Sequence, residues 1–193
     1  QLVGQIEAGP DGPWLQYEEA WTSGRDSFPI SLTMPLAQAR YGPQVTAPWL
    51  MNLLPEGEPL RVVTRALGVA QDDILGLIAN LGRDLAGALT MGEPRRGDTP
   101  DLTPLPAEAL ERIIEELPAR PFLVGEEGVS MSLAGAQGKL PLAMTGEGLA
   151  IPVNGAASTH ILKPDNPRLP GSVQNEARQA RIVGLENVGR RRP

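Results

Sequence analysis

The sequence has no cysteine and only one histidine, His160. It therefore excludes a disulfide framework, a cysteine-based metal site and a metal site made of several histidines. Aromatic residues make up only 4% of the chain, so aliphatic side chains must form most of the core. No hydrophobic run has the length of a membrane span and no secretory signal is evident, so we expect a cytoplasmic protein without a membrane partner.

Basic residues are also scarce, and lysine is the scarcer of the two types. The chain carries 17 Lys and Arg against 23 Asp and Glu, a formal net charge of -6, which argues against direct binding of nucleic acid. Only two of the basic residues are lysines, Lys139 and Lys163. The single basic cluster, GRRRP at 189–193, is expected to be a solvated tail. The positions of the two lysines are therefore the first feature to explain.

The composition and the hydrophobic pattern predict an α+β protein. Alternating residues predict strands in the first part of the chain, and apolar residues at helical spacing predict helices after them. Residues 28–36 are predicted to be another extended segment, which its prolines limit to an edge or an irregular path. The predicted strands here are 2–8, 14–21 and 84–91, the predicted helices are 47–57, 58–69, 71–82 and 107–117, and 92–105 is a predicted loop.

The second region is predicted to be mainly β. Residues 129–144 (VSMSLAGAQGKLPLAM) indicate a strand, a tight loop and a second strand, and TGEG at 145–148 is a hairpin turn signal. Residues 149–153 and 158–164 are predicted strands. Residues 172–185 are predicted to form a helix.

The loop of small residues before Lys139 is the candidate functional feature. Small residues let backbone N–H groups approach an anion closely, and a lysine just behind the loop adds a positive charge. Lys163, on a later strand, can reach the same anion, and Glu176 on the predicted helix can hold Lys163 in place. A protein kinase small lobe uses this arrangement. The alternative is an ordinary hairpin with two exposed lysines and a carboxylate at a helix start.

Several ordered motifs resemble the HipA family of serine/threonine protein kinases, the toxin halves of bacterial toxin–antitoxin pairs. SLAGAQGK, THILKP and NEARQARIVGL are similar to motifs of its kinase portion, and NLLPEGEPLRVVTRA and GRDLAGALTM to its N-terminal subdomain. The resemblance runs from about Val3 to Leu185. It implies a HipA-type N-terminal subdomain over 1–120 and a kinase-like small lobe over 121–193.

The resemblance also implies roles for individual residues. Lys163 matches the lysine that contacts ATP, with Glu176 as its partner, and Ser132 matches an autophosphorylated serine. Phosphorylation there would add charge at the nucleotide site and displace the loop. The ATP phosphate loop is matched by Ala134, Gly135, Ala136, Gln137, Gly138 and Lys139.

The catalytic part of a kinase is not evident in the sequence. No H-x-x-D-x-x-x-x-N pattern is present, so no catalytic residue and no metal ligand is assigned here. The expectation is a chain truncated before the large helical lobe, which would supply the Mg²⁺ ligands, and therefore inactive by itself.

The family implies three kinds of partner: a protein substrate (an aminoacyl-tRNA synthetase), a HipB-type helix-turn-helix antitoxin, and DNA only through that antitoxin. The alternative is a naturally shortened, inactive chain that acts as a binding module for the antitoxin or for a kinase.

Two further motifs receive structural interpretations. His160 precedes Lys163 by three residues and is predicted to be structural. Arg83 and Asp84, in GRD, could be mistaken for a fragment of a catalytic loop, but they precede the phosphate loop. They are predicted to form a salt bridge within the N-terminal subdomain.

Overall fold

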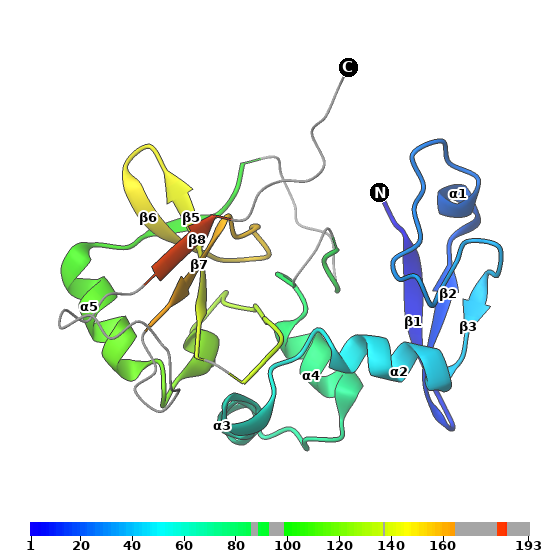
Figure 1. Ribbon diagram of the computed structural model, residues 1–193, viewed down its shortest axis with the longest axis horizontal. Coiled ribbons are helices and arrows are strands. Elements are labelled where there is room, and N and C mark those ends of the chain that lie inside the picture. Colours follow the sequence, from blue (N-terminus) through cyan, green and yellow to red (C-terminus); the bar gives the residue numbers. More distant parts are fainter. Residues whose placement is uncertain (86–88, 93–98, 137, 165–180, 185–193) are drawn as a thin grey trace.

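The chain folds into two antiparallel sheets joined by helices. The computed structural model describes residues 1–85, 89–92, 99–136, 138–164 and 181–184. Figure 1 shows the three-stranded sheet β1-β2-β3 at one end of an elongated molecule and the five-stranded sheet β4-β6-β5-β7-β8 at the other, with α2, α3 and α4 between them. The prediction of a mixed helix and sheet protein is thus confirmed at this level.

The first sheet is a hairpin extended by a short third strand. β1 (Gly4–Gly9) pairs with β2 (Gly12–Tyr17), which pairs with β3 (Arg40–Tyr41), and the short helix α1 (Glu19–Thr22) follows β2. Residues 28–36 take the irregular path and form no strand. The hydroxyl of Tyr17 fixes this path, since it donates to the carbonyl of Met34 (2.8 Å) and accepts from the amide of Ile30 (3.0 Å).

Three helices form the middle of the molecule, close to the predicted positions. They are α2 (Pro43–Met51), α3 (Gly57–Leu67) and α4 (Ile74–Leu81). Gly68 ends α3 with φ +66°, a conformation that favours glycine. Asp73 caps α4 by accepting a hydrogen bond from the amide of Gly76 (2.9 Å).

The second sheet contains the two lysines. Its hairpin, β5 (Leu140–Thr145) and β6 (Gly148–Pro152), turns at the predicted TGEG, and β7 (His160–Lys163) also lies where a strand was predicted. α5 (Ala107–Glu116) is confirmed, and the short helix η1 (Pro121–Leu123) follows it. The edge strands are β4 (Leu102–Pro104) and β8 (Arg181–Gly184).

Five of the sequence predictions for secondary structure are wrong. Residues 19–21, the end of a predicted strand, belong to the helix α1. The described part of 84–91 forms no strand, and residues 129–133 contribute one isolated bridge in place of a strand. Residues 102–104, within a predicted loop, form β4 because they pair with the edge of β6. Residues 181–184 form β8 where the end of a helix was predicted, because they pair with β7. Pairing with a distant strand overrides local propensity in the last two cases.

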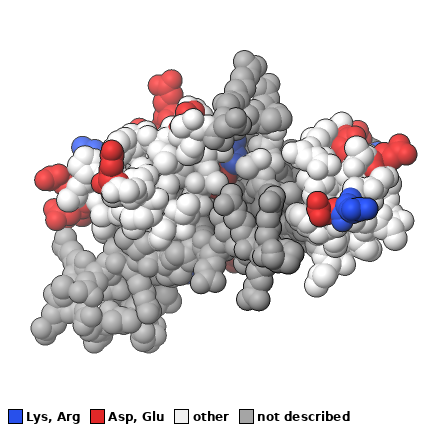
Figure 2. All heavy atoms as spheres, turned by 90° about the horizontal axis from the view of Figure 1, so that it is seen from above, with Lys and Arg blue, Asp and Glu red and all other residues white. Residues whose placement is uncertain are grey.

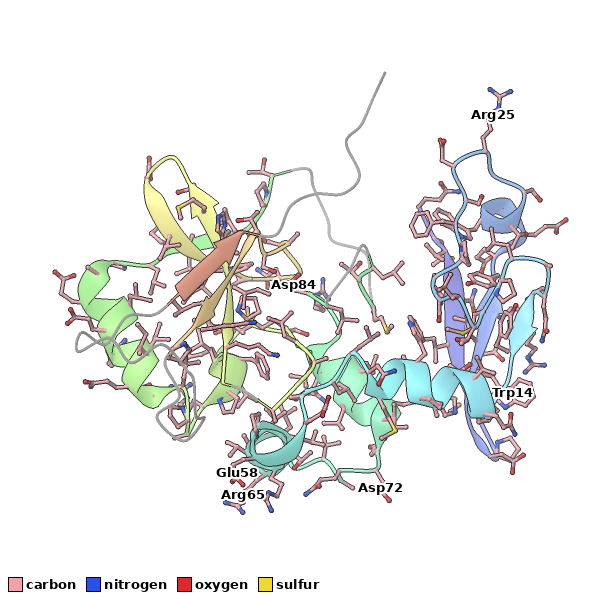
Figure 3. All side chains as sticks on the ribbon, in the orientation of Figure 1. Trp14, Arg25, Glu58, Arg65, Asp72 and Asp84 are labelled. Carbon is pink, nitrogen blue, oxygen red and sulfur yellow. The ribbon has the colours of Figure 1, made fainter. Side chains whose placement is uncertain are left out.

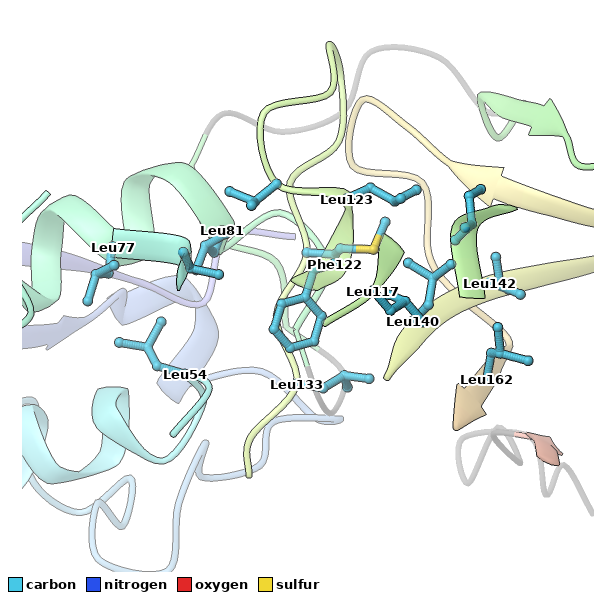
Figure 4. Packing of buried hydrophobic residues seen from close by; sticks show 14 of the residues in the cluster. Leu54, Leu77, Leu81, Leu117, Phe122, Leu123, Leu133, Leu140, Leu142 and Leu162 are labelled. Atoms are coloured by element: carbon cyan, nitrogen blue, oxygen red, sulfur yellow. The ribbon is translucent and has the colours of Figure 1, made fainter. Parts of the chain in front are cut away.

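One hydrophobic core connects the helices to the second sheet. Leu50 and Leu77 from α2 and α4, Leu117 after α5, and Leu140 and Leu162 from β5 and β7 all have an exposed fraction of 0% within the same cluster. Figure 4 shows Leu117 and Phe122 lying between the helices and the strands. The division at residue 120 stays a prediction, but both this core and the second sheet include residues on each side of it.

Candidate anion-binding site

The strand register brings the only two lysines of the chain together. β5 and β7 are antiparallel with Leu140 opposite Leu162, so the same register continued by one residue sets Lys139 opposite Lys163. Like charges directly opposite each other on neighbouring strands are destabilising. A fold that places its only lysines in such a pair therefore creates a local excess of positive charge in an otherwise acidic protein.

Lys139 is also buried, which adds to the cost of holding two positive charges side by side. Its side chain is only 9% exposed, and its ammonium group donates a hydrogen bond to the carbonyl of Ala134. Burial and, secondarily, the neighbouring charge of Lys163 lower the pKa of Lys139, while the carboxylate of Glu56 opposes this shift. A bound anion would stabilise the charged form of this lysine.

The 132–139 loop begins at Ser132, which is fully buried with an exposed fraction of 0%. Its amide donates to the carbonyl of Asp84 (3.0 Å) and its hydroxyl donates to the carbonyl of Leu53 (2.8 Å). Gly135 has φ +107°, and a Cβ atom at this position would lie 3.1 Å from Nζ of Lys139. Glycine is therefore needed here both for the backbone conformation and for the close approach of the lysine.

The prediction of a salt bridge between Arg83 and Asp84 is wrong. The guanidinium of Arg83 donates to the carbonyl of Asn154 (3.4 Å), and the carboxylate of Asp84 accepts from the amide of Ser158 (3.2 Å). The two side chains therefore connect the end of α4 to the loop before β7 and do not pair within the N-terminal subdomain. Figure 3 shows Asp84 between the helices and the second sheet.

Asp84 is a buried carboxylate that the sequence did not single out as such. It is 8% exposed, and burial raises its pKa, although hydrogen bonds from Ser158 oppose the rise. Its backbone also pairs with Met131, next to Ser132. The GRD motif thus positions the start of the 132–139 loop. The only sequence signal was the motif itself, since its contacts lie 46 or more residues away in the chain.

The remaining predicted site residues are only partly placed. Gln137 and Glu176 lie outside the described residues, so the predicted pairing of Glu176 with Lys163 stays a prediction. Ala134, Gly135, Ala136 and Gly138 lie in the loop between Ser132 and Lys139. Nδ1 of His160 lies 2.8 Å from the hydroxyl of Thr159, which gives this ring a local partner.

A pocket of about 520 Å³ lies elsewhere, between α5 and the β4–β6 edge. None of the predicted site residues lines it, and its rim carries ion pairs from Arg120 to Glu116 (3.6 Å) and to Glu126 (2.6 Å). Among the described helices, none is long and apolar enough to cross a membrane. Figure 2 shows acidic side chains at both ends of the displayed face and few basic ones.

Comparison with known proteins gives consistent results along the chain. Residues 1–92 match the family described as HipA N-terminal domain. Y4mE of Sinorhizobium fredii, a protein named as a kinase, is 39% identical over 197 aligned residues, which cover 96% of this chain and 47% of that protein. The serine/threonine-protein kinase toxin HipA of Shewanella oneidensis is 31% identical over 166 residues, covering 84% of this chain and 37% of that protein.

A solved structure supports the same relationship. A chain in the complex of Shewanella oneidensis HipA, HipB and operator DNA superimposes with a TM-score of 0.64 at 29% identity, covering 86% of this chain and 39% of that chain. The present chain thus spans less than half the length of these relatives. The matched N-terminal domain, the kinase relatives and the shared fold together show that this chain belongs to the HipA family, of which it represents an N-terminal portion.

Proposed function

We propose that this chain supplies the phosphate-binding part of a HipA-like serine/threonine protein kinase that uses Mg-ATP. The observation that carries the proposal is the pair of lysines, Lys139 and Lys163, which the β5–β7 register sets opposite each other beside a loop of small residues. A triphosphate between them would offset both their mutual repulsion and the burial of Lys139.

In the proposed site, the 132–139 loop covers the phosphates of ATP. Lys139 and Lys163 contact those phosphates, Glu176 holds Lys163, and Ser132 is the site of regulatory autophosphorylation. The ammonium group of Lys139 donates to the carbonyl of Ala134, so it would have to leave this carbonyl to contact a phosphate. The phosphate oxygens would then replace that carbonyl as acceptors of a charge-assisted hydrogen bond.

Mg²⁺ would accompany ATP and neutralise part of the phosphate charge. Among the residues that the structure describes, no group of three or more His, Asp or Glu side chains could hold a metal ion. We therefore assign the protein ligands of Mg²⁺, together with the catalytic aspartate, to the large lobe of the kinase. This chain would contribute orientation and charge, and its own residues carry no step of phosphoryl transfer.

The proposed partners follow from the family relationship. They are a protein substrate, which for this family we take to be an aminoacyl-tRNA synthetase, and a HipB-like helix-turn-helix antitoxin. The related structure from Shewanella oneidensis, which contains HipA, HipB and operator DNA, supports the antitoxin assignment. With a net charge of -6, this chain would reach DNA through a basic antitoxin, and we place the assembly in the cytoplasm.

The test uses the fact that the chain has only two lysines. Reductive ¹³C-methylation gives each lysine its own NMR signal, and ATP, pyrophosphate and adenosine are added in turn. We expect ATP and pyrophosphate, but not adenosine, to shift both lysine signals, and Lys163→Ala to abolish the response while the fold is retained. Arg25→Ala is the matched control, since Arg25 is a cation on the loop after α1, far from the two lysines in Figure 3. No shift of either signal at millimolar pyrophosphate would refute the phosphate site.

A second candidate function is supported by the same relative. The chain could act as a binding module for a HipB-like antitoxin or for a kinase, without catalysis, because HipA in the related structure stands in a complex with HipB and DNA. Size-exclusion chromatography with a HipB-type protein distinguishes the two functions. Stable association together with the absence of any lysine response to pyrophosphate would favour the binding module.

A further inference from the structure

The start of the 132–139 loop is attached to the N-terminal helical region by two hydrogen bonds. Both involve Ser132, whose amide donates to Asp84 and whose hydroxyl donates to Leu53, 79 residues earlier in the chain. Because Ser132 has an exposed fraction of 0%, no reagent can reach its hydroxyl while these bonds are intact. The two acceptors are carbonyl oxygens, so a phosphate on this serine would face two groups that repel it.

A third hydrogen bond attaches the tip of the loop to the same region. The amide of Glu56 donates to the carbonyl of Gly135 (3.2 Å), and Pro55 and Gly135 form a parallel bridge. The next residue, Gly57, has φ +60°, and a Cβ atom there would lie 3.7 Å from Cβ of Ala136. Residues 53–57, which lead from α2 to the first residue of α3, therefore contact the loop at residues 132, 135 and 136.

This attachment is more exposed at the tip of the loop than at its base. Leu54 and Leu133 belong to the hydrophobic core, whereas Glu56 and Ala136 are exposed, and the neighbouring strand β5 has Leu140 and Leu142 at 0% exposure. Segments with few buried contacts and solvent-exposed hydrogen bonds open at a lower free-energy cost than the core. Opening can therefore begin at the tip of the loop while β5 stays folded, and it exposes Ser132 once Leu133 also leaves its contacts.

We infer that residues 53–57 are a latch on the 132–139 loop, and that opening this latch exposes the Ser132 hydroxyl. The latch belongs to the segment that matches the HipA N-terminal domain, so that domain controls access to the serine of the neighbouring loop. The inference deepens the proposed function, on which it rests for the role of Ser132 as a regulatory site. A partner that holds residues 53–57 in place would keep Ser132 closed.

The distance between positions 57 and 136 allows the latch to be locked covalently. The 3.7 Å separation of the Cβ positions lies within the range of about 3.5–4.5 Å found for disulfides. Because the chain contains no cysteine, the double variant Gly57→Cys/Ala136→Cys can form only this bond within one chain. Oxidised and reduced forms of the same protein can then be compared by hydrogen exchange and mass spectrometry, with each single variant as a control.

We expect the disulfide to slow amide exchange in residues 131–136 by about tenfold or more and to leave β5 unchanged. Equal exchange of the loop in the oxidised and reduced forms would overturn the latch, because locking would then have removed no opening. An equal slowing in β5 would also overturn it, since the opening would then be global unfolding.

A second measurement covers the case in which the double variant fails to fold. Ser132→Cys introduces a unique thiol at the closed position, and Ala136→Cys introduces one at an exposed position of the same loop. We expect the thiol of Ser132→Cys to react with a thiol reagent about a hundredfold more slowly than the thiol of Ala136→Cys. Local opening exposes little surface, so the rate for Ser132→Cys should hardly change at low concentrations of urea. Equal rates, or a steep rise with urea, would contradict a local latch. Neither measurement involves a nucleotide, so their failure is distinct from failure of the phosphate site.

Discussion

The buried hydroxyl of Ser132 provides the most direct test of how the 132–139 loop is held. Ser132→Ala removes the donor to the carbonyl of Leu53 (2.8 Å) but keeps the amide bond to Asp84 and nearly all of the packing volume. The loss of a partner from a buried acceptor costs about 1–3 kcal/mol. For a chain of this size, each kcal/mol lowers Tm by roughly 2–4 °C, so we expect a decrease of about 2–12 °C.

Ser130→Ala is the matched control for this measurement. Ser130 lies two residues away. Its hydroxyl donates to the carbonyl of Asn80 (2.6 Å) in an exposed bond, and it accepts a long bond from the amide of Arg83 (3.4 Å), so water can replace the lost hydroxyl. We therefore expect Ser130→Ala to cost less, about 0.5–1 kcal/mol. Urea denaturation followed by circular dichroism measures both variants. If Ser132→Ala is no less stable than Ser130→Ala, the hydroxyl bond to Leu53 does not hold the loop and this reasoning is wrong.

Three other predictions concern the charged and apolar interior. The NMR titration of Lys139 should give a pKa below its ordinary value of 10.5, and pyrophosphate should raise this pKa. The free energy of unfolding should then rise with pH between the lowered pKa and 10.5, because the unfolded chain binds more protons in that range. An unshifted pKa would refute the burial argument. Asp84→Asn should be more stable than the native protein at pH 7, because burial raises the pKa of Asp84 and its charged form destabilises the fold. This advantage should disappear as the pH falls toward 3.8, where the carboxyl group becomes neutral. If urea denaturation showed the same difference in free energy of unfolding across this pH range, Asp84 would be solvated and not buried. Leu162→Ala should lower the free energy of unfolding by about 2–5 kcal/mol, since Leu162 is 0% exposed. Met144→Ala on β5, at 46% exposure, should lower it by well under half as much. Similar decreases for the two variants in urea denaturation would contradict the assignment of the core.

Local sequence patterns predicted most of the helices and the central hairpin. α3, α4 and α5 follow from apolar residues at helical spacing. The β5–β6 turn follows from TGEG. β8 was missed because its pairing with β7, and not its own propensity, decides its conformation. The conformation of Phe122, with φ +56° in the fully buried η1 segment, has no local signal either.

The sequence by itself determined the composition of the candidate site: two lysines in an acidic chain whose other basic residues are all arginines, a loop of small residues and the motifs of the HipA family. Only the tertiary structure decided that Lys139 lies opposite Lys163, that Ser132 is closed by Leu53, and that Asp84 is a buried positioning residue and not half of a salt bridge. Periodicity and turn chemistry report on neighbours a few residues apart. These contacts join segments 24 to 79 residues apart, and they form only when helices and strands pack into one shared core.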